Sequence, residues 1–324
     1  MSWTAVLVAV AVAALCFVAV RRLLHVVLAT ALAAIVLVGG YALAAHVASS
    51  GPPAGGRGAS SRTAEASSGT RGSDGGGATA SSRYTPHRAP VPILMYHVLG
   101  TTPVGSPYPD LFLAPADFRA QMTFLKRHGF EAVTLRRVWD NWHRHRGTLP
   151  RKPVVITFDD GENAQLRVAE PILRAYHWPA VLNLVVDHYR TEPAAIGRGA
   201  VRRLVSEGWE IDSHTMHHSK LTTLSAAQLT IEVARSRAEL RATFRVPVDF
   251  FCYPAGFYDE RVIAAVRSAG YLAATTTTPG LATRSSAAFQ LPRIRVDRGL
   301  PLSSFAAEVS RGDFGGAGAT DTGE

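Results

Sequence analysis

PVVITFDDG, residues 153–161, is the stretch around which the rest of this chain is organised. Its apolar, β-branched first half predicts a buried strand, which ends abruptly in Asp159, Asp160 and a glycine. A buried strand rarely ends in two charges unless a cation or a substrate receives them. Further along, IDSHTMHH, residues 211–218, repeats the arrangement with histidines. Together the two stretches supply the ligand types of a catalytic metal site.

Each of these two signals also has a plainer interpretation when it is taken alone. An Asp-Asp-Gly sequence is most often a turn or a helix cap, and a histidine-rich segment is most often a solvated loop. Both signals occur here in one chain, each directly after an apolar, strand-like run. That joint occurrence favours the metal site.

The positive charge of the chain is concentrated in its N-terminal part. The 324 residues carry a net charge of +9, and residues 1–90 hold seven arginines against Glu65 and Asp74, which is +5 of that total. This distribution favours contact with anionic lipid or wall polymer, and we expect no nucleic-acid partner. The two cysteines, Cys16 and Cys252, lie in unrelated contexts, so neither a disulfide nor a zinc finger is predicted.

The first 48 residues predict a membrane anchor or a signal segment. Two apolar runs, 3–20 and 23–45, flank an Arg-Arg pair. They form either one or two transmembrane helices or a cleaved signal peptide, and both interpretations place the rest of the chain outside the cytoplasm.

The remaining chain divides into a linker, a globular domain and a tail. Residues 49–88 are rich in Gly, Ser, Ala and Arg and predict a disordered linker. Residues 89–310 have globular patterning, and residues 311–324 predict a disordered tail. The expected catalytic domain is therefore 89–310.

Strands and helices are predicted to alternate along the globular domain. Helical patterns include one that ends at Gly129, one from Ser225 to about Phe244, and one over 259–268. Eight apolar runs predict strands at 91–96, 130–134, 153–158, 180–186, 209–213, 249–253, 271–275 and 291–296. This alternation predicts an α/β fold, either a (β/α) barrel or a doubly wound sheet, in which chemistry sits at the C-terminal strand ends.

Three motifs resemble those of the polysaccharide deacetylase family, the NodB-homology domain of carbohydrate esterase family 4. TFDDG (157–161) is similar to its first motif, HTMHH (214–218) to its second, and FCYPAG (251–256) to a variant of its third. The resemblance covers about residues 90–300 and is strongest to the branch that deacetylates poly-N-acetylglucosamine. It implies a distorted (β/α) barrel and a hydrolase that acts on carbon–nitrogen bonds in linear amides.

The resemblance also implies roles for individual residues. Position by position, Asp160, His214 and His218 correspond to the ligands of a divalent metal, commonly zinc, and Asp159 corresponds to the catalytic base. The backbone N–H of Ala255 corresponds to the oxyanion donor. A carboxylate with two imidazoles suits zinc, and histidines four apart converge from one helical face or from a tight loop.

Two positions depart from the family pattern. Cys252 stands where many members carry an arginine that orients the base, and Arg293 stands where the last motif usually has a histidine acid. His97, in PILMYHV, resembles the N-terminal histidine that serves as the acid in the poly-N-acetylglucosamine branch, and its ordinary pKa suits that role. Arg293 or Asp297 is expected to orient His97 or Asp159.

The leading hypothesis is an exported, membrane-tethered, zinc-dependent N-deacetylase of N-acetylglucosamine-containing polysaccharide. Poly-N-acetylglucosamine and peptidoglycan are rival substrates, and chitin oligomers are a third. The alternative hypothesis is a catalytically inactive glycan-binding module with the same fold, which the two departures motivate. A metalloprotease is disfavoured because His-Glu-x-x-His is absent.

Overall fold

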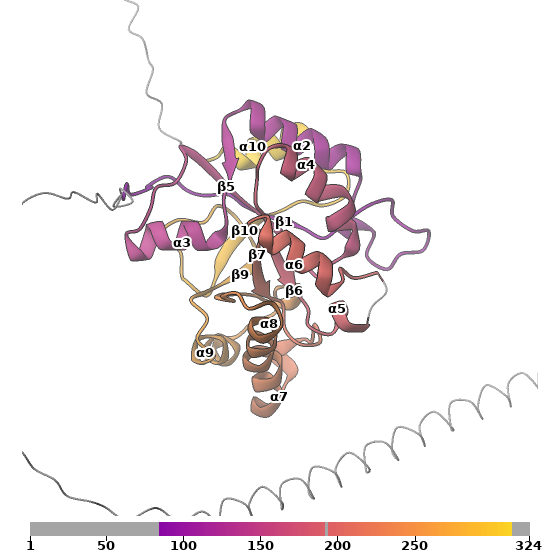
Figure 1. Ribbon diagram of the computed structural model, residues 1–324, viewed down its shortest axis with the longest axis vertical. Helices are drawn as coiled ribbons and strands as arrows, with labels where there is room; N and C mark the ends of the chain where they lie inside the picture. Colours follow the sequence, from indigo (N-terminus) through magenta and orange to yellow (C-terminus); the bar gives the residue numbers. More distant parts are fainter. Residues whose placement is uncertain (1–83, 192–193, 313–324) are drawn as a thin grey trace, which may run out of the picture. The chain divides into compact units, whose positions relative to one another are not determined.

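The computed structural model describes residues 84–191 and 194–312 (Figure 1). The predicted membrane segment, 1–48, lies outside the described residues, as do most of the linker and most of the tail. Among the described residues, no helix combines the length and the apolar character needed to cross a bilayer.

Seven parallel strands close into a barrel. From β1 (Ile93–Tyr96) the order runs through β10 (Leu291–Arg295), β9 (Ala273–Pro279), β8 (Phe250–Cys252), β7 (Glu210–Ser213), β6 (Val181–Leu184) and β5 (Lys152–Phe158), and β5 pairs with β1 again. β4 (Phe130–Ala132) pairs with the first three residues of β5, ahead of the stretch that contacts β6. The barrel, rather than the open doubly wound sheet, is therefore the fold.

Helices connect these strands around the barrel (Figure 1). They are α2 (Pro115–Arg127), α3 (Leu135–Arg144), α4 (Glu170–Ala175), α5 (His188–Thr191), α6 (Arg198–Ser206), α7 (Ala226–Thr230), α8 (Ser236–Phe244), α9 (Glu260–Ser268) and α10 (Leu302–Val309). The connections also contain two π turns, η2 (Gln165–Ala169) and η4 (Ile231–Arg235), and three 3₁₀ turns, η1 (Pro109–Leu111), η3 (Leu221–Thr223) and η5 (Pro254–Gly256). A short pair of strands, β2 (Val98–Leu99) and β3 (Phe112–Leu113), follows β1.

All eight predicted strands are present, and so are the predicted helix starts. Ser225 caps α7 through its side chain, and Asp259 caps α9 in the same way. The helix predicted from Ser225 to about Phe244 continues through the π turn η4 before it ends at Phe244. The main difference is β9, which extends to Pro279 and so runs beyond the prediction.

Strand alternation sorts the side chains of β5 between two environments. Val154, Ile156 and Phe158 belong to the main core between the barrel and its helices. Val155 points the other way and belongs to a second apolar cluster, with Ile93 and Phe250, that fills the barrel interior. The interior-facing positions therefore begin apolar on β5 and lead up to Asp159 at the strand end.

The globular part begins earlier than the predicted boundary at residue 89. Asn141 of α3 donates from Nδ2 to the carbonyl oxygen of Thr85 at 2.8 Å, and its Oδ1 accepts from the His87 amide at 2.9 Å. Residues 84–88, assigned to the linker from composition, are thus held against α3. Composition could not reveal this because the contacts depend on individual pairs, such as Asn141 with the Thr85 and His87 backbone and the Tyr84 ring with that of His145.

Candidate active site

A pocket of about 440 Å³ opens at the C-terminal ends of the barrel strands. Its lining includes every position for which the motifs predicted a direct role: His97, Asp159, Asp160, His214, His218 and Ala255. Parallel strands bring their carboxyl ends to one edge, so residues far apart in sequence meet there.

Asp160, His214 and His218 form a group whose ligand atoms lie within 4.8 Å of one another. The Oδ1 atom of Asp160 lies 3.5 Å from Nε2 of His214 and 3.4 Å from Nε2 of His218. His214 directs its other nitrogen, Nδ1, at the carbonyl oxygen of Cys252, 2.8 Å away, which fixes the ring and leaves Nε2 toward the carboxylate. This donor set fits a divalent cation with an open coordination position.

The electrostatic field of the site also suits a cation. Burial lowers the pKa of His214, but Cys252, Asp159 and Asp160 raise it more, to about 10. The field that holds a proton on this imidazole is the field that attracts a metal ion in its place. Burial and the neighbouring His214 lower the pKa of His218 to about 4, so this ring is neutral and able to bind metal.

The two ligand histidines converge from a tight loop and not from a helix. Thr215 and His218 have left-handed backbones, with φ of 74° and 58°, and Asp160 does as well, with φ of 71°. The hydroxyl of Thr215 accepts from the His218 amide at 2.9 Å and so closes the loop. The His-x-x-x-His spacing is thus realised by a turn, one of the two arrangements that the spacing allowed.

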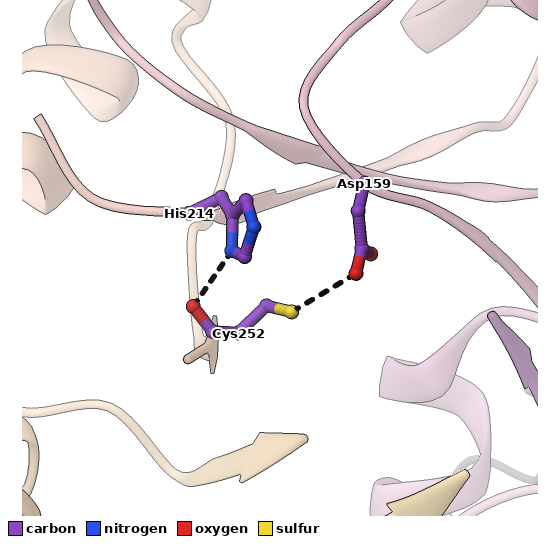
Figure 2. Close-up of side chains that lie close together, drawn as sticks. All are labelled: Asp159, His214 and Cys252. Atoms are coloured by element: carbon purple, nitrogen blue, oxygen red, sulfur yellow. Dashed lines mark hydrogen bonds between the residues drawn. The ribbon is translucent and has the colours of Figure 1, made fainter. Parts of the chain in front are cut away.

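Asp159, His214 and Cys252 form a second, fully buried group of ligand-type atoms (Figure 2). We do not interpret it as a metal site, because Arg293 donates to both carboxylate oxygens of Asp159, from Nη1 to Oδ1 and from Nη2 to Oδ2, each at 2.8 Å. A cation placed there would sit beside a buried guanidinium. Figure 2 shows that the Cys252 thiol points at Asp159, and the contact is 3.6 Å.

Arg293 supplies Asp159 with the guanidinium that the third motif, with Cys252, lacks. It is fully buried, it comes from β10, and its Nε donates to the Thr276 carbonyl at 2.8 Å. Burial alone raises the pKa of Asp159, but the charge and hydrogen bonds of Arg293 outweigh it and hold that pKa well below its ordinary value. Asn183 donates to Oδ1 at 2.7 Å. Of the two predicted orienting residues, the structure brings Arg293 to the site.

Asp297, the other predicted orienting residue, is directed elsewhere. It is 38% exposed and accepts from Nε of Arg295 at 2.6 Å. That ion pair lies at the edge of the pocket, which Arg295 lines. The sequence could not choose between Arg293 and Asp297, because the two share the same phase of alternation and the choice depends on where β10 ends, which is at Arg295.

His97 lies beside Asp159, with its Nε2 atom 3.8 Å from Oδ2 of the carboxylate. Its Nδ1 atom is buried and has no partner among the described residues. Burial lowers the pKa of His97 further than Asp159 and Asp160 raise it, so the imidazole is neutral at neutral pH. The predicted proton-handling pair is therefore adjacent.

Ala255 lines the pocket from the turn η5 and has a left-handed backbone, with φ of 50°. The next residue, Gly256, has φ of 73°, and a Cβ there would lie 1.9 Å from the Thr277 hydroxyl oxygen. Glycine is thus required for this turn to approach β9. The predicted oxyanion role of the Ala255 N–H stays a prediction.

Three further residues around the pocket carried no sequence signal. His188 directs Nδ1 at the Asp160 carbonyl oxygen, 3.2 Å away. Gln165, at the start of η2, donates from Nε2 to the carbonyls of Asp159 at 2.7 Å and His97 at 3.2 Å. Glu232, in η4, binds the loop that carries the ligand histidines. All three contact backbone atoms, and a motif of side chains does not show such contacts.

Gln165→Met is expected to lower the free energy of unfolding by about 1–2 kcal/mol, because the carbonyls of Asp159 and His97 lose the amide donor of Gln165, although the Gly161 amide still donates to the Asp159 carbonyl. Gln165 is fully buried, whereas Gln290 is exposed, so Gln290→Met is the matched control and is expected to change stability by less than about 0.5 kcal/mol. Urea unfolding followed by circular dichroism measures both variants. Equal stability of the two would show that the buried amide contributes nothing.

Comparisons with known proteins agree with this geometry. A family model described as "Polysaccharide deacetylase" matches residues 146–274. "Putative polysaccharide deacetylase YxkH" of Bacillus subtilis strain 168 is 30% identical over 230 residues, which is 68% of this chain and 76% of that protein. A poly-beta-1,6-N-acetyl-D-glucosamine N-deacetylase of Staphylococcus aureus strain MRSA252 is 25% identical over 197 residues, 57% of this chain and 67% of that protein.

Solved structures show the same fold. BC0361, a polysaccharide deacetylase from Bacillus cereus, aligns with a TM-score of 0.61 and 27% identity, covering 69% of this chain and 70% of that one. His97 and Arg293 both lie outside the residues that the family model matches. On the match to YxkH, the chain belongs to the polysaccharide deacetylase family, hydrolases that act on carbon–nitrogen bonds in linear amides.

Proposed function

We propose that this protein is a metal-dependent N-deacetylase that hydrolyses acetamido groups of an N-acetylglucosamine-containing polysaccharide. One observation carries the proposal: a pocket that holds the Asp160–His214–His218 ligand group also holds a buried carboxylate, Asp159, within reach of His97. Metal ligands, an ionised carboxylate and a neutral imidazole are the groups that amide hydrolysis requires.

Asp160, His214 and His218 are the residues we assign to the cation, and their nitrogen and oxygen donors favour zinc. A divalent ion held there supplies Lewis-acid chemistry, since it polarises the amide carbonyl and makes a water molecule acidic enough to lose a proton to a weak base. The Ala255 N–H is the proposed second contact to the carbonyl oxygen as negative charge develops on it.

Asp159 is the proposed base and His97 the proposed acid. Arg293 and Asn183 donate to the Asp159 carboxylate, which fixes its position and keeps it ionised and therefore able to accept a proton. The same contacts make the Asp159 carboxylate a weak proton acceptor. The water molecule would therefore have to be made more acidic by the divalent ion before Asp159 could take its proton. Because His97 is neutral, the proton that Asp159 takes from the water would pass to its imidazole, whose Nε2 lies 3.8 Å from the carboxylate. The imidazolium, beside the carboxylate that is ionised again, would then give that proton to the leaving amine.

The relatives support a polysaccharide substrate. The Staphylococcus aureus relative is named for poly-beta-1,6-N-acetyl-D-glucosamine, so this glycan is our first candidate, with peptidoglycan the second. The apolar runs within residues 1–48 favour export and anchoring in the membrane. An inactive glycan-binding module is disfavoured, because Arg293 supplies from β10 the guanidinium that the third motif lacks.

The test is acetate release from poly-N-acetylglucosamine, peptidoglycan and chitin oligomers, with zinc added or with the metal removed by a chelator. We expect release from at least one of these polymers and none after chelation. If the protein binds the glycans but releases no acetate, with or without added zinc, the proposed activity is wrong and the protein is a glycan-binding module.

His97→Ala is expected to lower kcat by about 10²-fold on the same polymer, because the leaving amine loses its proton donor. The affinity for zinc is expected to stay unchanged, since His97 is not among the assigned ligands. A matched control is His128→Ala, which removes an exposed histidine at the C-terminal end of α2 and is expected to leave kcat unchanged. Full activity of the His97 variant would remove this residue from the mechanism.

A further inference from the structure

The loop of residues 214–218, which carries the two ligand histidines, has an unfavourable backbone conformation at two positions. Thr215 and His218 both have left-handed φ values, 74° and 58°, although neither is a glycine. The loop follows β7 and has no strand pairing of its own beyond Ser213. A backbone held in this way requires surrounding contacts that fix it.

One side of the loop is held by the segment that follows β6. The amide of Val186 donates to the Thr215 carbonyl at 3.1 Å, and the amide of Asp187 donates to the Met216 carbonyl at 3.0 Å. These bonds satisfy carbonyl oxygens only. The amides of Met216 and His217, in the middle of the loop, point the other way.

Glu232 holds the other side. Its Oε2 atom accepts from the amides of Met216 and His217, each at 3.0 Å. Its Oε1 atom lies 2.7 Å from Nδ1 of His217 and accepts from the Ser219 hydroxyl at 2.9 Å. The side chain of His217, which motif spacing left without a function, thus serves as one of four groups gathered on a single carboxylate.

The carboxylate reaches the loop because of where it sits on its helix. Glu232 is 4% exposed and belongs to the π turn η4, between α7 and α8. π turns widen a helix locally and recur at functional sites. At the end of the same turn, the hydroxyl of Ser236 lies 2.9 Å from that of Ser213, the last residue of β7. The helix is therefore fixed to the strand immediately before the loop that Glu232 binds.

We propose that Glu232 is a positioning residue that sets the geometry of the 214–218 loop and thereby the affinity of the Asp160–His214–His218 group for its metal. The proposal rests on the assignment of that group under the proposed function. Glu232 contacts none of the three ligands; it acts through the backbone between His214 and His218.

Metal affinity of the metal-free protein distinguishes this role from a general contribution to stability. The metal-free full chain is titrated with zinc against a chromophoric chelator. Glu232→Met, which removes all four contacts, is expected to raise the Kd for zinc about tenfold. Glu232→Gln keeps an oxygen for the amides and an NH₂ for His217 and Ser219, so a smaller rise, about threefold, is expected from the lost charge.

Glu239→Met is the matched control. Glu239 lies on α8, the continuation of the same helix, and its carboxylate pairs with Arg190 away from the pocket. Glu239→Met is expected to leave the Kd for zinc unchanged. Thermal unfolding of the metal-free variants shows whether a change in zinc affinity comes from the loop geometry or from a loss of folding stability. Cobalt in place of zinc reports the coordination geometry through its visible spectrum.

A folded Glu232→Met variant with the zinc Kd and the cobalt spectrum of the parent would overturn the proposal. Should that variant not fold, Glu232→Gln decides, and an unchanged Kd there has the same consequence. The experiment requires no substrate, so its outcome is independent of acetate release. Failure of the proposed function would appear instead as normal metal binding without hydrolysis.

Discussion

Arg293→Met is expected to lower the free energy of unfolding by about 3–5 kcal/mol, because it leaves the Asp159 carboxylate buried without its partner. Both residues are almost fully buried, and the two guanidinium nitrogens meet the two carboxylate oxygens. Urea unfolding measures the loss. The control is Arg295→Met, two residues further along β10, whose pair with Asp297 is about 40% exposed and worth less than about 1 kcal/mol.

The double variant Arg293→Met, Asp159→Asn shows whether the unpaired charge is the cause. Removing the charge of Asp159 in the Arg293→Met background is expected to restore part of the lost stability, since a neutral amide costs less to bury than a carboxylate. Additive losses from the two substitutions would show that the ion pair is not the origin of the effect.

The Arg293–Asp159 pair predicts opposite pH dependences of stability in the parent protein and in Arg293→Met. In the parent protein Arg293 holds the pKa of Asp159 below the ordinary 3.8, so its stabilising contribution is present above that value and is lost as the pH falls. In Arg293→Met the lowering effect of the guanidinium is gone, and burial, the largest of the influences that remain, raises the pKa against the weaker effects of His214 and His97, so stability is lost as the pH rises through it. The stability difference between parent and variant is therefore expected to be larger at pH 8 than at pH 4.

Asp159→Asn is expected to lower kcat by about 10³-fold, because the amide cannot take a proton from water. The neighbouring substitution Asp160→Asn gives the sharpest comparison, since the two carboxylates are adjacent in sequence but assigned to different roles. Asp159→Asn is expected to keep most of the parent's affinity for zinc, since it removes a nearby charge but no ligand, whereas Asp160→Asn is expected to lose far more affinity and to regain some activity at high zinc concentration.

Zinc titration and acetate release, measured on both variants, separate the base from the ligand. If Asp159→Asn retains more than about a tenth of the parent kcat, the base is another group, since general bases contribute at least 10²-fold. If Asp160→Asn binds zinc unchanged, the ligand assignment is wrong.

The sequence by itself determined the elements and the chemistry of the strand ends. Apolar runs located the eight strands of the larger sheet, though not the short pair β2 and β3, because burial on one or both faces imposes a pattern that is local in the chain. DDG after β5 and HTMHH after β7 identified the pocket, because metal ligands are few in kind and stand at strand ends. The closure of β5 onto β1 was not visible, since pairing between distant strands leaves no local trace.

Only the tertiary structure decided which residues support that chemistry. Arg293 reaches Asp159 because alternation along β10 turns it into the barrel, while Asp297, beyond the strand, pairs with Arg295. Gln165 and Glu232 bind backbone atoms of segments that precede them in the chain, and a hydrogen bond to the backbone selects no particular residue in that segment. A motif records the side chains that meet the substrate or the metal, whereas the contacts that hold them arise only when the barrel closes.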